Sequence, residues 1–284
     1  MENVLVSISV LAGAVTVCEV LRRIAKELLW PWRGRSKGNL SRSPHSEPPN
    51  LEVVVELFST LQLCICTHEL RLLGSSGLLG LIPALTLTYL ATLIHVSTFG
   101  SATCNPVSCL EHYLCGQSNG QIAAAKVLAQ LAAASVARQL MELVWALDMS
   151  DLHWYHHQRQ YKCTSTLNTT AENGLVTEFT CAFTLRAALF RFHLLKQRHK
   201  IHVVAALITF LVFAAGDLTG AVFNPVLAYS ITFNCEGSTY PEYCFVYWLG
   251  PLMGAMTAVL LFERESVDGA DARSATEEAK EKRS

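Results

Sequence analysis

Charge is scarce in this 284-residue sequence: only 16% of its residues are charged, and the formal net charge is −1. A balance so close to zero, with no basic face, gives no reason to expect nucleic acid as a partner. No nucleophile stands in register with a base, and no glycine loop is spaced to cradle a phosphate, so nothing indicates an enzyme or a cofactor. Apolar residues are abundant instead, at 51% of the chain.

These apolar residues are gathered into long runs separated by short polar segments. Several runs approach the roughly 20 residues that a helix needs to cross the hydrocarbon core of a membrane. The sequence therefore predicts an all-α, multi-pass membrane protein with six spans from residue 51 onward and one hydrophobic helix before them. The runs lie near 4–18, 53–66, 78–98, 121–147, 174–190, 201–215 and 243–262.

The first hydrophobic helix, near 4–21, has the wrong charge order for a cleaved signal peptide. Glu2 precedes the run, and Arg22, Arg23 and Lys26 follow it, whereas a signal peptide begins with its positive charges. The positive-inside rule favours an uncleaved span whose C-terminal flank is cytosolic. An interfacial helix remains the alternative.

The chain divides into three parts by composition. Residues 1–50 hold the hydrophobic helix and a basic linker rich in proline and serine, 51–262 form the membrane domain, and 263–284 are a charged cytosolic tail. The tail has lysines at Lys282 and Lys280, the third and fifth positions from its end, as in a dilysine retrieval signal. This pattern favours the endoplasmic reticulum, although charged tails also produce it by chance.

Basic residues indicate how the domain is oriented. Arg191, Lys196, Arg198 and Lys200 crowd between the fourth and fifth spans, which places that loop in the cytosol. Alternation then puts the loop 148–173 on the lumenal side. We therefore expect Asn168, in an Asn-Thr-Thr sequon, to be a glycosylation site, and Asn39 in the basic linker to stay unmodified.

The membrane domain contains an internal repeat, 51–147 and 174–262. Glu178 follows Glu56 by 122 positions, and Asn224-Pro225-Val226 follows Asn105-Pro106-Val107 by 119. Three spans in each half require the halves to insert with opposite topology. Inverted repeats of this kind build a site at the midplane of the membrane from discontinuous helices.

The two Asn-Pro pairs predict helix starts, because asparagine caps a helix N-terminus and proline is tolerated at the first helical position. We expect two short helices, near 107–114 and 226–232, whose positive ends face a pore centre. The amides of Asn105 and Asn224 would donate to a passing water oxygen. Glu56 and Glu178 lie inside apolar runs, so we expect them to face the bundle interior, in a structural role rather than as a proton relay.

These features resemble the aquaporin superfamily across 51–262, and 216–225 resembles its second signature loop. The stretches 17–23, 147–153 and 246–252 resemble the unorthodox superaquaporins, in particular the aquaporin-twelve branch. The resemblance implies a right-handed bundle of six spans and two re-entrant half-helices that forms a homotetramer in lipid. It also implies a channel of intracellular membranes for water or a small neutral solute, such as glycerol or hydrogen peroxide, with both asparagines at its centre.

The sequence departs from the orthodox pattern in the selectivity region and at the motifs. Leu227 stands where an arginine usually guards the outer constriction, Val212 stands where a histidine is usual, and Val107 and Val226 replace alanine. Without the arginine, selectivity does not follow from the fold. A non-conducting scaffold is therefore the main alternative. A coupled transporter is a weaker one, because inverted repeats with intramembrane carboxylates also occur there.

Cysteine and histidine raise two further questions. Most of the ten cysteines lie in or beside apolar runs, where cysteine acts as a small hydrophobe. Cys163, Cys235 and Cys244 lie in polar segments and are candidates for bridging, but no pairing can be read from the sequence. The segment from His153 to His157 holds three histidines and two aromatic residues. No ligand spacing completes a metal site, so an interfacial aromatic segment is favoured over zinc.

Overall fold

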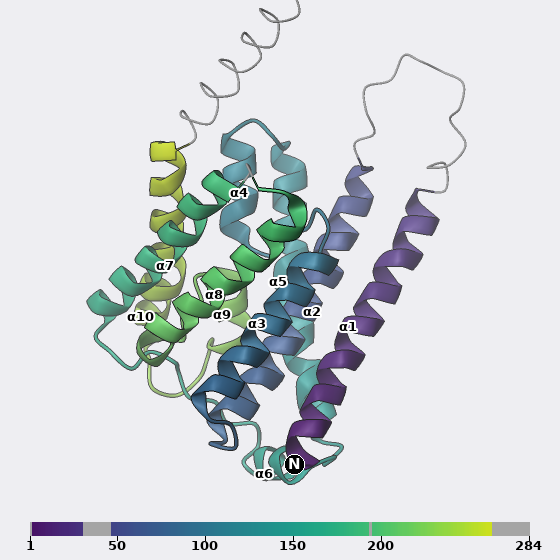
Figure 1. The fold of residues 1–284 in the computed structure, drawn as a ribbon, viewed down its shortest axis with the longest axis vertical. Coiled ribbons are helices and arrows are strands. Elements are labelled where there is room, and N and C mark those ends of the chain that lie inside the picture. The colour runs from purple at the N-terminus through teal and green to yellow at the C-terminus, as the bar shows by residue number, and fades with distance from the viewer. Residues whose placement is uncertain (1, 31–46, 193–194, 263–284) are drawn as a thin grey trace, which may run out of the picture.

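The computed structural model describes residues 2–30, 47–192 and 195–262, which are helical with no strand among them (Figure 1). The expected Asn39 sequon and the Lys280 and Lys282 signal lie outside the described residues. The elements are α1 (Glu2–Leu29), α2 (Pro49–Ser75), α3 (Leu81–Thr98), α4 (Pro106–Leu114), α5 (Gly120–Trp145), α6 (Asp151–Gln158), α7 (Ala171–Phe192), α8 (Gln197–Thr219), α9 (Pro225–Ile231), α10 (Tyr240–Cys244) and a π-helical turn, η1 (Phe245–Leu249).

Six described helices are long and apolar enough to cross a membrane: α1, α2, α3, α5, α8 and the continuous stretch Tyr240–Phe262 that begins with α10. α7 also has the length of a span, at 22 residues, and carries Glu178 and Arg186 within it. The two short helices α4 and α9 begin at the Asn-Pro pairs. The predicted all-α bundle with two half-helices and an extra N-terminal helix is therefore what the structure has.

The two repeats pack against each other through equivalent elements. α3 contacts α8, α5 contacts α9, and α4 contacts α9, so each half-helix touches the other half of the molecule. Within the halves, α2 packs along α5, and α7 packs along η1. The α2–α5 contact is close because the α5 residues Ala134 and Ala137 are fully buried beside Cys64. Small residues at helix interfaces let backbones approach each other in this way.

Two glycines bring the last helix against α7. A side chain at Gly254 would meet the carbonyl oxygen of Phe179 at 2.2 Å, and one at Gly250 would meet the carbonyl of Leu175 at 3.1 Å. The two glycines are four positions apart, so they lie on one face of their helix. This face gives the α7 backbone room to pass.

The N-terminal helix α1 lies beside α2 (Figure 1) and is tied to it by buried polar contacts. Arg22, only 2% exposed, donates to the Gln62 side chain at 2.7 Å. Further along, the Ser7 hydroxyl donates to the Glu69 carboxylate at 2.5 Å. Residue 7 meets residue 69, and residue 22 meets residue 62, so α1 and α2 are antiparallel. α1 is also long and apolar enough to cross a membrane.

The segment from His153 to His157, predicted to be interfacial, has both exposed and buried side chains. Trp154 and Tyr155 of α6 are exposed, but His153 is fully buried, and its Nε2 lies 3.0 Å from Glu69. The Trp145 indole donates to the same carboxylate at 2.9 Å. The sequence did not predict that His153 is buried. Its partner lies 84 positions earlier in the chain, and short sequence spacing gives no signal of such a contact.

A disulfide closes the same end of the molecule. Cys163, after α6, is bonded to Cys235, after α9. These are two of the three cysteines proposed for bridging, while Cys244 is free and half-buried. The cysteines in the apolar runs, among them Cys64, Cys104 and Cys181, are buried and free.

Candidate functional site

The candidate site lies where α4 and α9 begin. Asn105 caps α4, because its side-chain oxygen accepts from the Val107 amide at 3.0 Å. Asn224 caps α9 in the same way, accepting from the Val226 amide at 3.2 Å and the Leu227 amide at 3.4 Å. Pro106 and Pro225 occupy the first helical positions, where no backbone donor is needed. The same local chemistry therefore starts both half-helices.

The two asparagines also link the half-helices to each other. The Asn105 Nδ2 donates to the carbonyl of Phe223 at 3.4 Å, and the Asn224 Nδ2 donates to the carbonyl of Cys104 at 2.7 Å. Each amide thus bonds the residue that precedes the other asparagine. Because an amide nitrogen carries two hydrogens, each asparagine keeps one donor for a further acceptor. The N-termini of both helices meet at this point and make it electropositive.

The backbone before each asparagine is strained. Cys104 has φ of 52° and Phe223 has φ of 34°, in the left-handed region that residues other than glycine seldom adopt. Such conformations cost on the order of 1–3 kcal/mol each and persist only where the surroundings fix them. The repeat therefore places an equivalent strained residue on each side of the centre.

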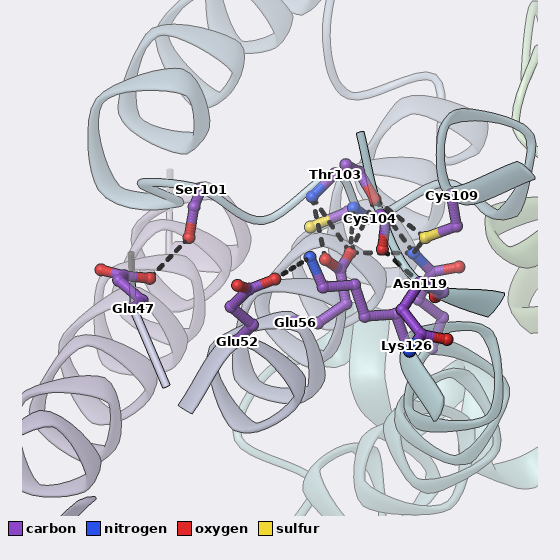
Figure 2. Close-up of polar contacts among 11 residues, drawn as sticks. Glu47, Glu52, Glu56, Ser101, Thr103, Cys104, Cys109, Asn119 and Lys126 are labelled. Atoms are coloured by element: carbon purple, nitrogen blue, oxygen red, sulfur yellow. Dashed lines mark hydrogen bonds and ion pairs between the residues drawn. The ribbon is translucent and has the colours of Figure 1, made fainter. Parts of the chain in front are cut away.

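Glu56 holds the first strained loop (Figure 2). Its carboxylate, fully buried on α2, accepts from the Thr103 amide at 3.1 Å and from the Cys104 amide at 2.5 Å. It also accepts from the Thr103 hydroxyl at 3.0 Å and from Gln130 of α5 at 2.8 Å. The loop, α2 and α5 are joined at this one group.

Glu178 holds the second loop from the equivalent place on α7. It is fully buried and accepts from the Thr219 hydroxyl at 2.6 Å, the Val222 amide at 3.0 Å and the Phe223 amide at 2.5 Å. Both carboxylates therefore bind the backbone of the residue just before an asparagine. All of their described partners are donors, as a carboxylate that positions a loop requires.

A cavity of about 50 Å³ opens beside the centre, with room for a few water molecules. Asn105, Val107 and Phe223 line one part of it, and α7 lines another through Leu185 and Arg186. Asn224 and Val226 are absent from its lining. Of the two motifs, only the first therefore faces this cavity.

The remaining residues of the site lie in separate surroundings. Val226 is fully buried against Cys64, Ala134 and Ala137, and so packs into the protein. Leu227 packs between that cluster and the one around Tyr247. Val212 packs near Ala215, Ala221 and Phe223. The structure therefore does not bring Val212 and Leu227 into one cluster.

One charged pair at the cavity was not predicted from the sequence. Arg186 of α7 pairs with Glu111 of α4, whose side chain is 3% exposed. A charge buried to this extent requires a partner. The only available signal was an arginine inside an apolar run, and this did not identify the glutamate 75 positions earlier.

Known proteins resemble the chain in sequence and in fold. Residues 98–262 match the family described as Major intrinsic protein. The chain is 36% identical over 209 residues to human aquaporin-11, an alignment that covers 74% of this chain and 76% of that protein. It is 31% identical over 269 residues to mouse aquaporin-12, covering 93% of this chain and 87% of that protein.

Among solved structures, the X-ray structure of the aquaglyceroporin from Plasmodium falciparum matches with a TM-score of 0.55 and 12% sequence identity. The match covers 76% of this chain and 96% of that chain. At this level of identity the likeness shows the fold alone.

Proposed function

We propose, on the premise that this chain belongs to the major intrinsic protein family of aquaporins, that it is a passive channel for water or a small neutral solute in an intracellular membrane. The superaquaporin resemblance noted in the sequence is confirmed by these relatives, and members of the family are channels, not enzymes. Glycerol and hydrogen peroxide are the solutes we would test beside water. We also propose a homotetramer in the lipid bilayer and residence in the endoplasmic reticulum, as the lysines of the tail favour.

The observation that carries the proposal is the mutual bonding of the two half-helices. Asn105 and Asn224 each cap a helix and donate to the other repeat, and each retains one amide hydrogen. Two donors fixed at the meeting point of two positive helix ends bind a neutral oxygen and raise the barrier to cations. A solute can bind to these two donors and leave them again without any covalent chemistry.

The test compares three asparagines that all cap helices. Asn105→Ala and Asn224→Ala remove a cap at the proposed pore centre, whereas Asn119→Ala removes the cap of α5, where Asn119 accepts from Gln121 at 2.9 Å. Each variant is reconstituted in liposomes, and shrinkage is followed after osmotic steps of impermeant solute and of glycerol. Peroxide entry is followed with a dye trapped in the vesicles.

We expect wild-type flux above that of empty vesicles for at least one solute, with a large loss in Asn105→Ala and Asn224→Ala. Asn119→Ala should conduct like the wild type, since it lies away from both half-helix starts. Absence of wild-type flux for all three solutes would reject the channel.

A non-conducting scaffold is the second candidate, and Leu227 is the observation that favours it. It stands at the position of the usual arginine and packs between two apolar clusters, so no charge from this residue orders solute there. The scaffold predicts that Asn105→Ala and Asn224→Ala leave every cellular phenotype intact. The coupled transporter requires flux that follows a proton gradient and disappears in Glu178→Gln.

A further inference from the structure

A second cavity, larger than the one beside Asn105, lies away from the pore centre. It has a volume of about 300 Å³, within the range of small-molecule sites. α2, α5, α6 and the end of α9 enclose it, together with the segment after α6 that carries Cys163. None of its lining residues lines the small cavity beside Asn105. It is therefore a separate compartment on the α6 side of the molecule.

The lining of this cavity is positively charged. Four of its residues are arginine or lysine, namely Arg71, Arg138, Arg159 and Lys162, and one is acidic, Glu142. Burial and then the charge of Arg159 lower the pKa of His156, which also lines the cavity, so this histidine adds no charge near neutral pH. The excess charge comes from permanently charged side chains.

The two inner arginines, Arg71 and Arg138, have a structural role, because both bind backbone carbonyls. Arg71 donates to the carbonyls of Ile231, the last residue of α9, and Thr164. Arg138 donates to the carbonyl of Phe233 at 2.8 Å, and its Nε lies 3.7 Å from Glu142. Cations at a helix C-terminus are favourable. Arg71 contacts no carboxylate within 4 Å among the described residues, so its charge is balanced only by dipoles.

The two outer cations have no comparable structural partner. The guanidinium of Arg159 lies over the Tyr155 ring at 5.7 Å. The amine of Lys162 is 3.8 Å from the Glu236 carboxylate, and the side chains of Lys162 and Glu236 are both more than 60% exposed. Surface pairs of this kind contribute little to stability. Bonded cations inside and exposed cations at the rim form a field that concentrates anions in a partly enclosed space.

We propose that this cavity binds a small anion that carries a phosphate or carboxylate group, with the oxyanion between the arginines and the rest of the ligand against its aromatic wall. Guanidinium groups suit such oxyanions because their donors form paired hydrogen bonds. Trp145, Tyr155 and Tyr161 supply the aromatic wall. The anion is either a soluble one or the headgroup of a lipid, and both present the same chemistry.

The test measures binding in the full-length protein by tryptophan fluorescence, because Trp145 lines the cavity. Inorganic phosphate is titrated into detergent-solubilised protein, with sodium chloride of equal ionic strength as the blank. We expect a saturable change with phosphate alone. Arg159→Gln with Lys162→Gln should weaken it by about tenfold or more, since charged hydrogen bonds are lost. Arg198→Gln, an exposed charge that lines neither cavity, should leave it unchanged.

A second arm identifies a lipid source. The protein is reconstituted in phosphatidylcholine vesicles with and without phosphatidic acid, and the same fluorescence is recorded. A change that requires phosphatidic acid and disappears in the double variant assigns the site to a lipid headgroup. To show that the double variant is folded, the Cys163–Cys235 disulfide is checked by thiol alkylation and should be intact.

The proposal is overturned if neither phosphate nor phosphatidic acid changes the fluorescence, or if the double variant responds like the wild type. The binding measurement does not depend on conduction. Absence of flux in liposomes therefore does not contradict the anion site, and absence of anion binding does not contradict the channel.

Discussion

At the scale of single residues, the two intramembrane glutamates determine the shape of the centre. Each is placed by an apolar helix and satisfied by donors from a loop about 45 positions away, in the same repeat. The residue that Glu56 fixes most closely, Cys104, has a strained φ of 52°. Hydrogen bonds to a buried charge are among the stronger ones, so they offset the backbone strain of such a residue.

We expect Glu56→Gln to destabilise the protein. The amide group would turn one acceptor into a donor against the Thr103 and Cys104 amides, and each unsatisfied buried group costs about 1–3 kcal/mol. Thermal unfolding of purified protein, followed by tryptophan fluorescence, measures the loss. Glu172→Gln, which changes an exposed carboxylate in the first turn of α7, is the matched control. Equal losses in both variants would contradict the loop-holding role.

The sequence could predict those residues of the site that recur in both repeats, but not the others. Asn105, Asn224, Glu56 and Glu178 were recognisable because each pair recurs at nearly the same offset in two halves of the chain. The Arg186–Glu111 pair has no counterpart in the other repeat among the described contacts. Val226 could not be placed either, because the identity of a residue in a motif does not tell which side of a short helix faces the cavity.

At the scale of elements, local signals predicted helix starts well and contacts between helices poorly. The half-helices were expected near 107–114 and 226–232 and run over Pro106–Leu114 and Pro225–Ile231. Their starts depend on an asparagine and a proline, which act within one turn. The burial of His153 in α6 and the polar contacts of α1 depend on Glu69 and Gln62 of α2. Such contacts form only when distant helices pack, and neither residue is exceptional in sequence.

We expect Gly254→Val to separate the last helix from α7. Its side chain would start 2.2 Å from the Phe179 carbonyl, and because this is backbone, a change of rotamer cannot relieve the clash. Overpacking of this kind costs about 1–3 kcal/mol or more. Gly13→Val in α1 introduces the same side chain where nothing lies within 4 Å. Unfolding temperatures of the two variants decide the point, and an equal drop in both would refute the close approach.

At the scale of the whole molecule, the disulfide joins the segment between the two repeats to the second repeat. Cys163 and Cys235 are 72 positions apart, and a loop of this length makes a cross-link worth about 4 kcal/mol in the chain-entropy account. We expect Cys163→Ser and Cys235→Ser to lower the free energy of unfolding equally. The double variant should be no worse than either single one, because one bond is lost in each case.

Cys244→Ser is the control for these variants, since Cys244 is free. Mass analysis after alkylation of free thiols shows which cysteines are bonded. A lower stability for the double variant than for both singles would mean that the cysteines act separately. The pairing itself could not come from the sequence, because three candidates in polar segments allow three different bonds.

The orientation of the whole chain leads to a prediction about two sequons. Asn168 is exposed, and its side chain donates to the Asp217 carbonyl at 3.1 Å, near the end of α8. If the basic loop before α8 is cytosolic, Asn168 faces the lumen and Asn39 the cytosol. In cells, Asn168→Gln should abolish the mobility shift produced by an endoglycosidase, and Asn39→Gln should keep it. The opposite pattern would show that the chain has the reverse orientation, because only lumenal residues are glycosylated. The anion cavity beside α6 would then face the cytosol.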